Sequence, residues 1–170
     1  EDPKNAQGQN DNQNENETKK QPHDQNDQQI QQADPLANIP KWPWLEYIDI
    51  AEKIDSGPAI VIMYHYNCPT CRDAIPVYDE KINQYALEEV SFAYIEAPPY
   101  GPDNGDSPIP EKTTVPTGKL QQRENGKEKW HIGTPFIALL YEGRLVKYYE
   151  LVAPEFEVLL QELFNADLQN

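Results

Sequence analysis

Two cysteines, three residues apart, are the residues of this chain best suited to chemistry. The chain has 170 residues, and Cys68 and Cys71 of the segment Cys68-Pro69-Thr70-Cys71 are its only cysteines. A continuous apolar run, 59–64, precedes them, and a segment with amphipathic helical periodicity, 72–86, follows. A cysteine in the first turn of a helix meets unpaired N–H groups and the positive end of the helix dipole, which favour the reactive thiolate. A second cysteine one turn away is placed to close a disulfide, so the spacing suits thiol–disulfide exchange.

Two other uses of the cysteine pair remain open at this point. Two cysteines are too few for a four-thiolate zinc site, but His65 lies three residues before Cys68. His65, Cys68 and Cys71 are therefore a candidate ligand set for copper or zinc, although strand alternation places His65 on the face opposite Ile62. In the other use, the pair is a static disulfide in a tethered binding module.

Composition divides the chain near residue 40. Residues 1–34 contain 15 Asn or Gln and one large aliphatic residue, Ile30. Such a segment has too little apolar surface to offset its ordering entropy, so we predict that residues 1–40 form a disordered, acidic, Asn/Gln-rich tail or tether. Residues 41–170 carry the aromatic residues and are enough for one domain with a real core.

Charge limits the partners of the chain. The net charge is −15, so nucleic acid and anionic membrane surfaces are poor partners. In addition, no apolar run approaches the ~20 residues that span a bilayer.

The sequence starts at Glu1 without Met. We therefore expect that an upstream segment has been removed and that the protein works outside the cytoplasm, either periplasmic or secreted. A membrane anchor upstream of Glu1 is one arrangement that fits this expectation. We also expect the protein to be a monomer.

Hydrophobic periodicity and turn residues predict an α/β domain with a mixed sheet, helices on both faces and a right-handed βαβ crossover. The region from Pro98 to about Gly126 is rich in Pro, Gly and charge and is predicted to be a long loop, except near 118–123. The expected helices are 44–54, 69–86 and a closing helix from Pro154, and the expected strands are 59–66, 90–95, 136–141 and 145–151.

Three separated markers, in this order, resemble the thioredoxin superfamily. They are the Cys-x-x-Cys motif with Pro76 eight residues after Cys68, the Gly133-Thr134-Pro135 turn, and Gly143 in the following hairpin. The resemblance covers about residues 43–168 and implies a thioredoxin-like three-layer α/β/α fold with a central mixed β-sheet. It also implies a thiol–disulfide oxidoreductase that needs no bound cofactor and acts on protein thiols and disulfides, together with a redox partner protein.

The resemblance assigns roles to individual positions. Cys68 would be the more exposed nucleophile, and Cys71 would resolve the mixed disulfide. Pro135 would be cis and face the disulfide, leaving the backbone of Thr134 free to pair with a substrate strand. Pro69 has no N–H and Thr70 adds a hydroxyl donor, so both would tune the thiolate. His131, two residues before Gly133, is a candidate for proton transfer, with an exposed bystander as the alternative.

Departures from the family pattern leave the direction of electron flow undetermined. Ile62 stands where thioredoxins have a buried acid, which weakens the case for a general reductase. Asn67 replaces the usual aromatic residue before the first cysteine, and a conserved glycine of the family is replaced near Leu151. The Cys-Pro-x-Cys form resembles glutaredoxins and periplasmic disulfide oxidases more than thioredoxins. The segment between the second expected strand and Pro135 has nearly 40 residues, about twice the family minimum, and therefore contains a long insertion at about 97–130. Its two expected roles are a substrate lid and a sheet-edge decoration.

Overall fold

The computed structural model describes residues 38–102, 106–122 and 129–168, which contain a five-stranded mixed sheet, two α-helices and two short 3₁₀ helices. The predicted tail falls almost wholly within 1–37, outside the described residues. The strands are β1 (Pro58–Tyr64), β2 (Ser91–Glu96), β3 (Thr117–Lys119), β4 (Phe136–Tyr141) and β5 (Arg144–Glu150). The helices are η1 (Pro43–Tyr47), η2 (Ala51–Lys53), α1 (Pro69–Tyr85) and α2 (Phe156–Leu168). None of these helices is long and apolar enough to cross a membrane.

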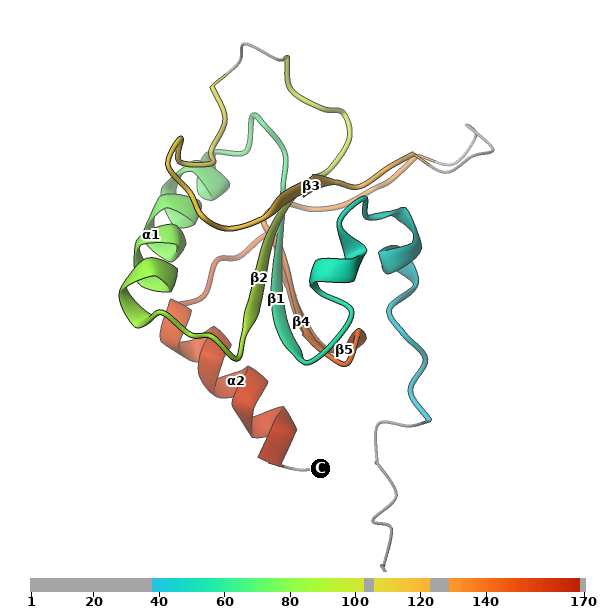
Figure 1. Ribbon diagram of the computed structural model, residues 1–170. Helices are drawn as coiled ribbons and strands as arrows, with labels where there is room; N and C mark the ends of the chain where they lie inside the picture. The colour runs from blue at the N-terminus through green and yellow to red at the C-terminus, as the bar shows by residue number, and fades with distance from the viewer. Residues whose placement is uncertain (1–37, 103–105, 123–128, 169–170) are drawn as a thin grey trace, which may run out of the picture. The chain divides into compact units, whose positions relative to one another are not determined.

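The sheet order is β3-β2-β1-β4-β5, with β1 parallel to β2 and antiparallel to β4 (Figure 1). Strands β1 and β4 are central and buried on both faces, which explains why their sequences are continuously apolar rather than alternating. The β4–β5 hairpin turns at Glu142 and Gly143, which both have positive φ, as expected of a tight hairpin turn. The mixed sheet expected from the sequence is confirmed.

The two faces of the sheet are covered differently. Both α-helices lie on one face, where Ile75 of α1 and Leu159 of α2 pack with Ile60 and Leu139 of the sheet (Figure 1). The opposite face is covered by the segment that contains η1 and η2, through Trp42, Leu45, Ile48 and Ile54. The three layers are present, but the third consists of 3₁₀ turns rather than an α-helix.

The prediction of an α-helix over 44–54 was therefore wrong. Ile48 has extended backbone angles and forms an isolated bridge with Leu120, and the N–H of Asp49 donates to the carbonyl of Lys119 (3.3 Å). The Asp49 carboxylate also accepts from the N–H of Lys119 (2.7 Å). This pairing beyond β3 interrupts the helical pattern, since a short side chain such as Asp competes for backbone donors and β-branched Ile has a lower helix propensity.

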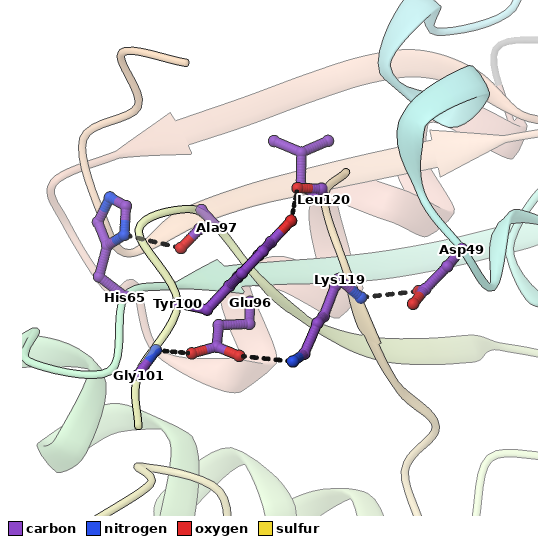
Figure 2. A network of polar contacts seen from close by, with 8 residues as sticks. All are labelled: Asp49, His65, Glu96, Ala97, Tyr100, Gly101, Lys119 and Leu120. Atoms are coloured by element: carbon purple, nitrogen blue, oxygen red, sulfur yellow. Dashed lines mark hydrogen bonds and ion pairs between the residues drawn. The ribbon is translucent and has the colours of Figure 1, made fainter. Parts of the chain in front are cut away.

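The region 97–130 is held to the sheet at its first turn. Figure 2 shows the Glu96 carboxylate, at the end of β2, accepting from the N–H of Gly101 (2.7 Å) and lying 4.0 Å from the Lys119 ammonium. The Tyr100 hydroxyl donates to the carbonyl of Leu120 (2.7 Å), and the Pro98–Pro99 peptide bond is cis. Residues 117–119 of this region form the edge strand β3, which pairs in parallel with β2. The role of the region, as a substrate lid or as an edge decoration, stays a prediction.

A buried carboxylate fixes the other side of the same region. Asp79 of α1 is 7% exposed, and it accepts from the hydroxyls of Tyr94 on β2 (3.4 Å) and of Thr113. Burial, and then the charge of Asp79, raises the pKa of Tyr94 far above its usual range, so this hydroxyl stays a donor. Helix α1, strand β2 and Thr113 of the region 97–130 thus meet at one polar cluster.

Candidate active site

The two cysteines lie at the N-terminus of α1 and form a disulfide. Cys68 is the N-cap residue, with a Cα–Cα distance of 5.3 Å to Cys71, and its Sγ accepts from the N–H of Cys71 (3.1 Å). Cys68 is 6% exposed, whereas Cys71 is fully buried. The helix places its unpaired N–H groups and the positive end of its dipole at Cys68, and the first turn contains no acidic residue.

The local sequence explains this placement. Strand β1 ends at Tyr64, and a turn closed by the N–H of Cys68 donating to the carbonyl of His65 (3.1 Å) leads to the cap. Pro69 at the first helical position has no N–H to satisfy, and its fixed φ suits a helix start. The cysteine pair is thereby carried at the carboxyl end of β1, supported by the buried helix residue Ile75.

The Gly133-Thr134-Pro135 turn lies at the same end of the sheet. The Thr134–Pro135 peptide bond is cis, and Pro135 leads directly into β4. Because Phe136 pairs with Met63 of β1, the start of β4 is next to the end of β1, where the chain continues to Cys68. The carbonyl of Pro135 accepts from the N–H of Leu151 (2.9 Å), and no hydrogen bond of the Thr134 backbone is found among the described residues.

Leu151, directly after β5, departs from ordinary backbone geometry. Its φ is +63°, and its side chain is 66% exposed. The left-handed region costs a non-glycine residue about 1 kcal/mol, and a glycine would adopt it without that cost. A Cβ at Gly133 would lie only 2.7 Å from Leu151 Cδ2, so the leucine side chain rests against the turn that contains Pro135.

Among the comparisons with known proteins, only the one with solved structures found matches to this chain. No family model and no curated protein matches the chain. A thiol-disulfide isomerase from Corynebacterium glutamicum is similar in structure, with a TM-score of 0.51 and 19% identity over 68% of this chain and 83% of that one. The chain has a thioredoxin-like fold. StoA from Bacillus subtilis (TM-score 0.47, 19% identity, 64% of this chain and 83% of that chain) and the exposed lipoprotein thioredoxin Etrx1 from Streptococcus pneumoniae (0.46, 17%, 72% and 89%) also match.

The two histidines singled out from the sequence do not join the cysteines. The Nδ1–H of His65 donates to the carbonyl of Ala97 (3.0 Å; Figure 2). His131 is exposed, and no contact of its side chain with a cysteine is found among the described residues. Within the same residues, no group of three or more His, Cys, Asp and Glu side chains is placed to hold a metal ion. The structure therefore assembles no ligand set from His65, Cys68 and Cys71.

Arg72 has a contact that the sequence did not indicate. Its guanidinium donates to the carbonyl of Tyr66 (2.9 Å) and to that of Asp106 (2.7 Å). Through these two bonds, Arg72 connects the turn before Cys68 with Asp106 of the region 97–130. The position of Arg72 directly after Cys71 was the one signal in the sequence for such a role. An exposed arginine on a helix is, however, usually interpreted as a solvated side chain.

Arg72→Met is expected to loosen the region that it anchors. A methionine keeps the aliphatic stem but donates nothing to the two carbonyls, so the loss of about 1 kcal/mol should speed amide exchange at Ile109 and Thr113 about fivefold. Hydrogen-exchange mass spectrometry resolves this segment. Lys53→Met, a matched change in η2, should leave the exchange of Ile109 and Thr113 unchanged. Unchanged exchange in Arg72→Met would show that the guanidinium does not hold the segment.

A groove begins at Thr70, which lies between the two cysteines in the sequence, and runs along α1. It has a volume of about 340 Å³, and Thr70, Ala74 and Val77 of α1 form one wall. The chain between β5 and α2, with Ala153 and Pro154, forms the other wall. The Tyr78 hydroxyl donates to the carbonyl of Pro154 (2.5 Å) and joins the two walls. Burial, followed by the charge of Glu155, raises the pKa of Tyr78 to about 12, so this bond persists at neutral pH.

An ion pair between Lys81 and Glu157, two residues that line the groove, has a defined pH dependence. Glu157 accepts from Lys81 Nζ (2.6 Å) and from the Tyr85 hydroxyl (2.9 Å). The Lys81 bond first, then a backbone N–H and Tyr85, lower the pKa of Glu157 from 4.5 to about 2. Because the folded pKa is depressed, the contribution to stability is fully present above the unfolded value and is lost as pH falls through the folded value.

Glu157→Gln should therefore lower the melting temperature slightly at pH 7, by an amount that shrinks to nothing as the pH falls from 4.5 toward 2. The effect is small because these groups are exposed and screened by solvent. Thermal melts of both proteins across this pH range measure it, with the exposed Glu80→Gln as the control. A difference that stays constant between pH 7 and pH 2 would contradict the assignment.

Proposed function

We propose that the chain is a thiol–disulfide oxidoreductase that exchanges disulfides with protein cysteines through Cys68 and Cys71. The observation that carries the proposal is the Cys68–Cys71 disulfide at the N-terminus of α1, with the Cys71 N–H donating to Cys68 Sγ. The same N–H, together with the helix dipole, stabilises a thiolate at Cys68 when the disulfide is reduced. The thioredoxin-like fold is consistent with this chemistry without specifying it.

In the reducing direction, the Cys68 thiolate attacks one sulfur of a substrate disulfide and expels the other as a thiolate. A mixed disulfide between Cys68 and the substrate results. Cys71, deprotonated, then attacks Cys68 Sγ, re-forms the Cys68–Cys71 bond and releases the second substrate thiolate. Two electrons pass to the substrate, and its two sulfurs take up two protons. The oxidising direction is the reverse, and the potential of the couple relative to its surroundings sets the net direction.

The substrate strand is proposed to lie along Thr134. The Thr134 backbone has no hydrogen bond among the described residues, and the adjacent Pro135 directly precedes β4, which starts beside the end of β1. An extended segment can add to exposed backbone groups in this way while its cysteine reaches Cys68. The hydroxyl of Thr70, which is exposed in the first turn of α1, is a further hydrogen-bond donor near the cysteine pair, whereas Pro69 has no N–H to donate.

We further propose that the protein works outside the cytoplasm as a monomer with a separate redox partner. Protein disulfides persist as substrates in oxidising compartments, and each turnover leaves the Cys68/Cys71 pair in the spent oxidation state. A second protein must then restore it. His131 is exposed and, lying two residues before Gly133, is proposed only as a tuning residue through its charge.

A single-turnover transfer of electrons tests the proposal. The protein is reduced, freed of reductant and mixed with an equal amount of insulin, and thiols are trapped with an alkylating reagent at successive times. The proposal predicts that two thiols appear on insulin for each Cys68/Cys71 pair oxidised. The oxidised protein is mixed in the same way with reduced insulin chains to test the opposite direction. Failure in both directions, with the insulin disulfides intact in the first mixture and the insulin thiols still reduced in the second, contradicts the proposal.

A further inference from the structure

The groove between α1 and the 153–157 segment offers an apolar surface that no part of the described chain covers. Val77, on its wall, is 51% exposed, and the neighbouring Ala74, Ala153 and Pro154 are also apolar. The polar group that joins the walls, the Tyr78 hydroxyl, already donates to the Pro154 carbonyl. An occupant of this groove therefore gains by burying an aliphatic side chain rather than by forming hydrogen bonds to the walls.

The groove continues directly from the cysteine pair. Thr70 lies between Cys68 and Cys71 in the sequence and lines one end, and Val77 lies seven residues further along the same helix. At 1.5 Å per helical residue this distance is about 10 Å, which an extended peptide covers with about three residues. A substrate joined to Cys68 is therefore long enough to place a nearby side chain against Val77.

The rim of the groove carries more negative than positive charge. Asp73, Glu155 and Glu157 line it together with a single cation, Lys81. The Lys81 ammonium is paired with Glu157 at 2.6 Å, and no ion pair joins Asp73 or Glu155 to a described basic side chain. Two carboxylates thus remain unbalanced beside an apolar groove, which complements a cationic residue next to an aliphatic one.

We propose that this groove selects protein substrates in which the reacting cysteine is flanked, within about three residues, by a large aliphatic side chain next to a lysine or arginine. This inference rests on the proposed function, since the groove acts on a substrate held at Cys68. The aliphatic side chain packs between Val77 and Pro154, and the basic residue faces Asp73 and Glu155. The groove therefore determines which cysteine is presented, and the exchange chemistry stays with the disulfide.

Three peptides and one small disulfide test this selection. Each peptide carries one cysteine joined by a disulfide to nitrothiobenzoate, whose release is coloured. The first has leucine and lysine on both sides of the cysteine, the second has serine for leucine, and the third has glutamate for lysine. The small disulfide of nitrothiobenzoate reports exchange without a peptide. The reduced protein should react with the leucine–lysine peptide about tenfold faster than with the serine peptide. It should react about fivefold faster than with the glutamate peptide at low salt, less at high salt.

Matched variants locate the effect. Val77→Ser should reduce the leucine preference to within about twofold and leave the rate with the small disulfide unchanged. Val158→Ser, at a valine of α2 that is 38% exposed and outside the groove, should keep the full preference. Asp73→Asn should reduce the lysine-over-glutamate ratio, whereas Glu80→Gln on the same helix should not. Each comparison uses the ratio of the rates that one variant shows with two peptides, so a change in the intrinsic reactivity of Cys68 affects both rates equally and cancels.

The possible failures are distinguishable. Equal rates with the leucine and serine peptides, together with a normal rate with the small disulfide, overturn the proposal that the groove selects substrates. The proposed function is not affected by this result. A Val77→Ser variant that slows all four probes equally also overturns it, because the valine would then act on the cysteines. No reaction of the wild-type protein with any probe overturns the proposed function and this inference with it.

Discussion

Replacing Cys68 by serine is expected to abolish disulfide exchange, leaving insulin reduction at the rate seen without protein. Serine keeps the N-cap geometry of α1, because its hydroxyl oxygen still accepts from the N–H of residue 71. It cannot, however, form the mixed disulfide on which each turnover depends. Dithiothreitol-coupled insulin reduction measures the loss directly, and unchanged far-ultraviolet circular dichroism shows that the variant is folded.

Cys71→Ser is the matched variant, and its expected result is different in kind. Cys68 still attacks, but no resolving thiol follows, so the protein accumulates as a covalent adduct with one substrate molecule. Non-reducing electrophoresis and intact mass spectrometry detect this adduct, which dithiothreitol should release. An adduct that forms equally well in Cys68→Ser would place the nucleophile at Cys71 and reverse the assignment.

Replacing Asp79 by alanine is expected to destabilise the domain by about 2–4 kcal/mol, although this residue lies two turns beyond the cysteines. The carboxylate accepts from the Tyr94 and Thr113 hydroxyls, and the Tyr94 side chain is fully buried. Truncation leaves the tyrosine donor buried without an acceptor, and such groups are costly. Urea denaturation measures the change in the free energy of unfolding.

A second substitution separates this mechanism from general disruption of α1. Tyr94→Phe removes the orphaned donor, so Asp79→Ala should cost about 1–2 kcal/mol less in the Tyr94→Phe background than in the wild type. The exposed neighbour Glu80→Ala should change the free energy of unfolding by less than about 0.5 kcal/mol. A cost for Asp79→Ala as small as that of Glu80→Ala would mean that the polar cluster does not stabilise the fold.

The sequence predicted the elements that local patterning determines. The apolar run of β1, the helix after Pro69 and the β4–β5 hairpin all lie within a residue or two of their expected bounds. In each, strand or helix propensity, turn residues and burial favour the same structure. The pattern at 44–54 gave the wrong element, because the pairing of Ile48 and Asp49 with residues near β3 is a long-range interaction that no local window contains.

The candidate site was predictable only in its chemistry. The Cys68/Cys71 spacing and its place before a helix could be read directly, since a helix N-terminus is a local feature. The groove could not, because its two walls are more than 70 residues apart in the sequence and meet only through the fold. The anchoring role of Arg72 was equally hidden, since one of its partners, the Asp106 carbonyl, is a backbone group in a loop.

The reduction potential of the Cys68/Cys71 couple is the measurement that tests the central claim most directly. The protein is equilibrated in graded dithiothreitol or glutathione buffers, the free thiols are alkylated, and the oxidised fraction is determined by mass spectrometry. The account predicts a reversible two-electron transition with a midpoint between about −270 and −120 mV, the range of exchanging thioredoxin-like proteins. A pair that stays oxidised below about −300 mV, as structural disulfides do, would contradict it.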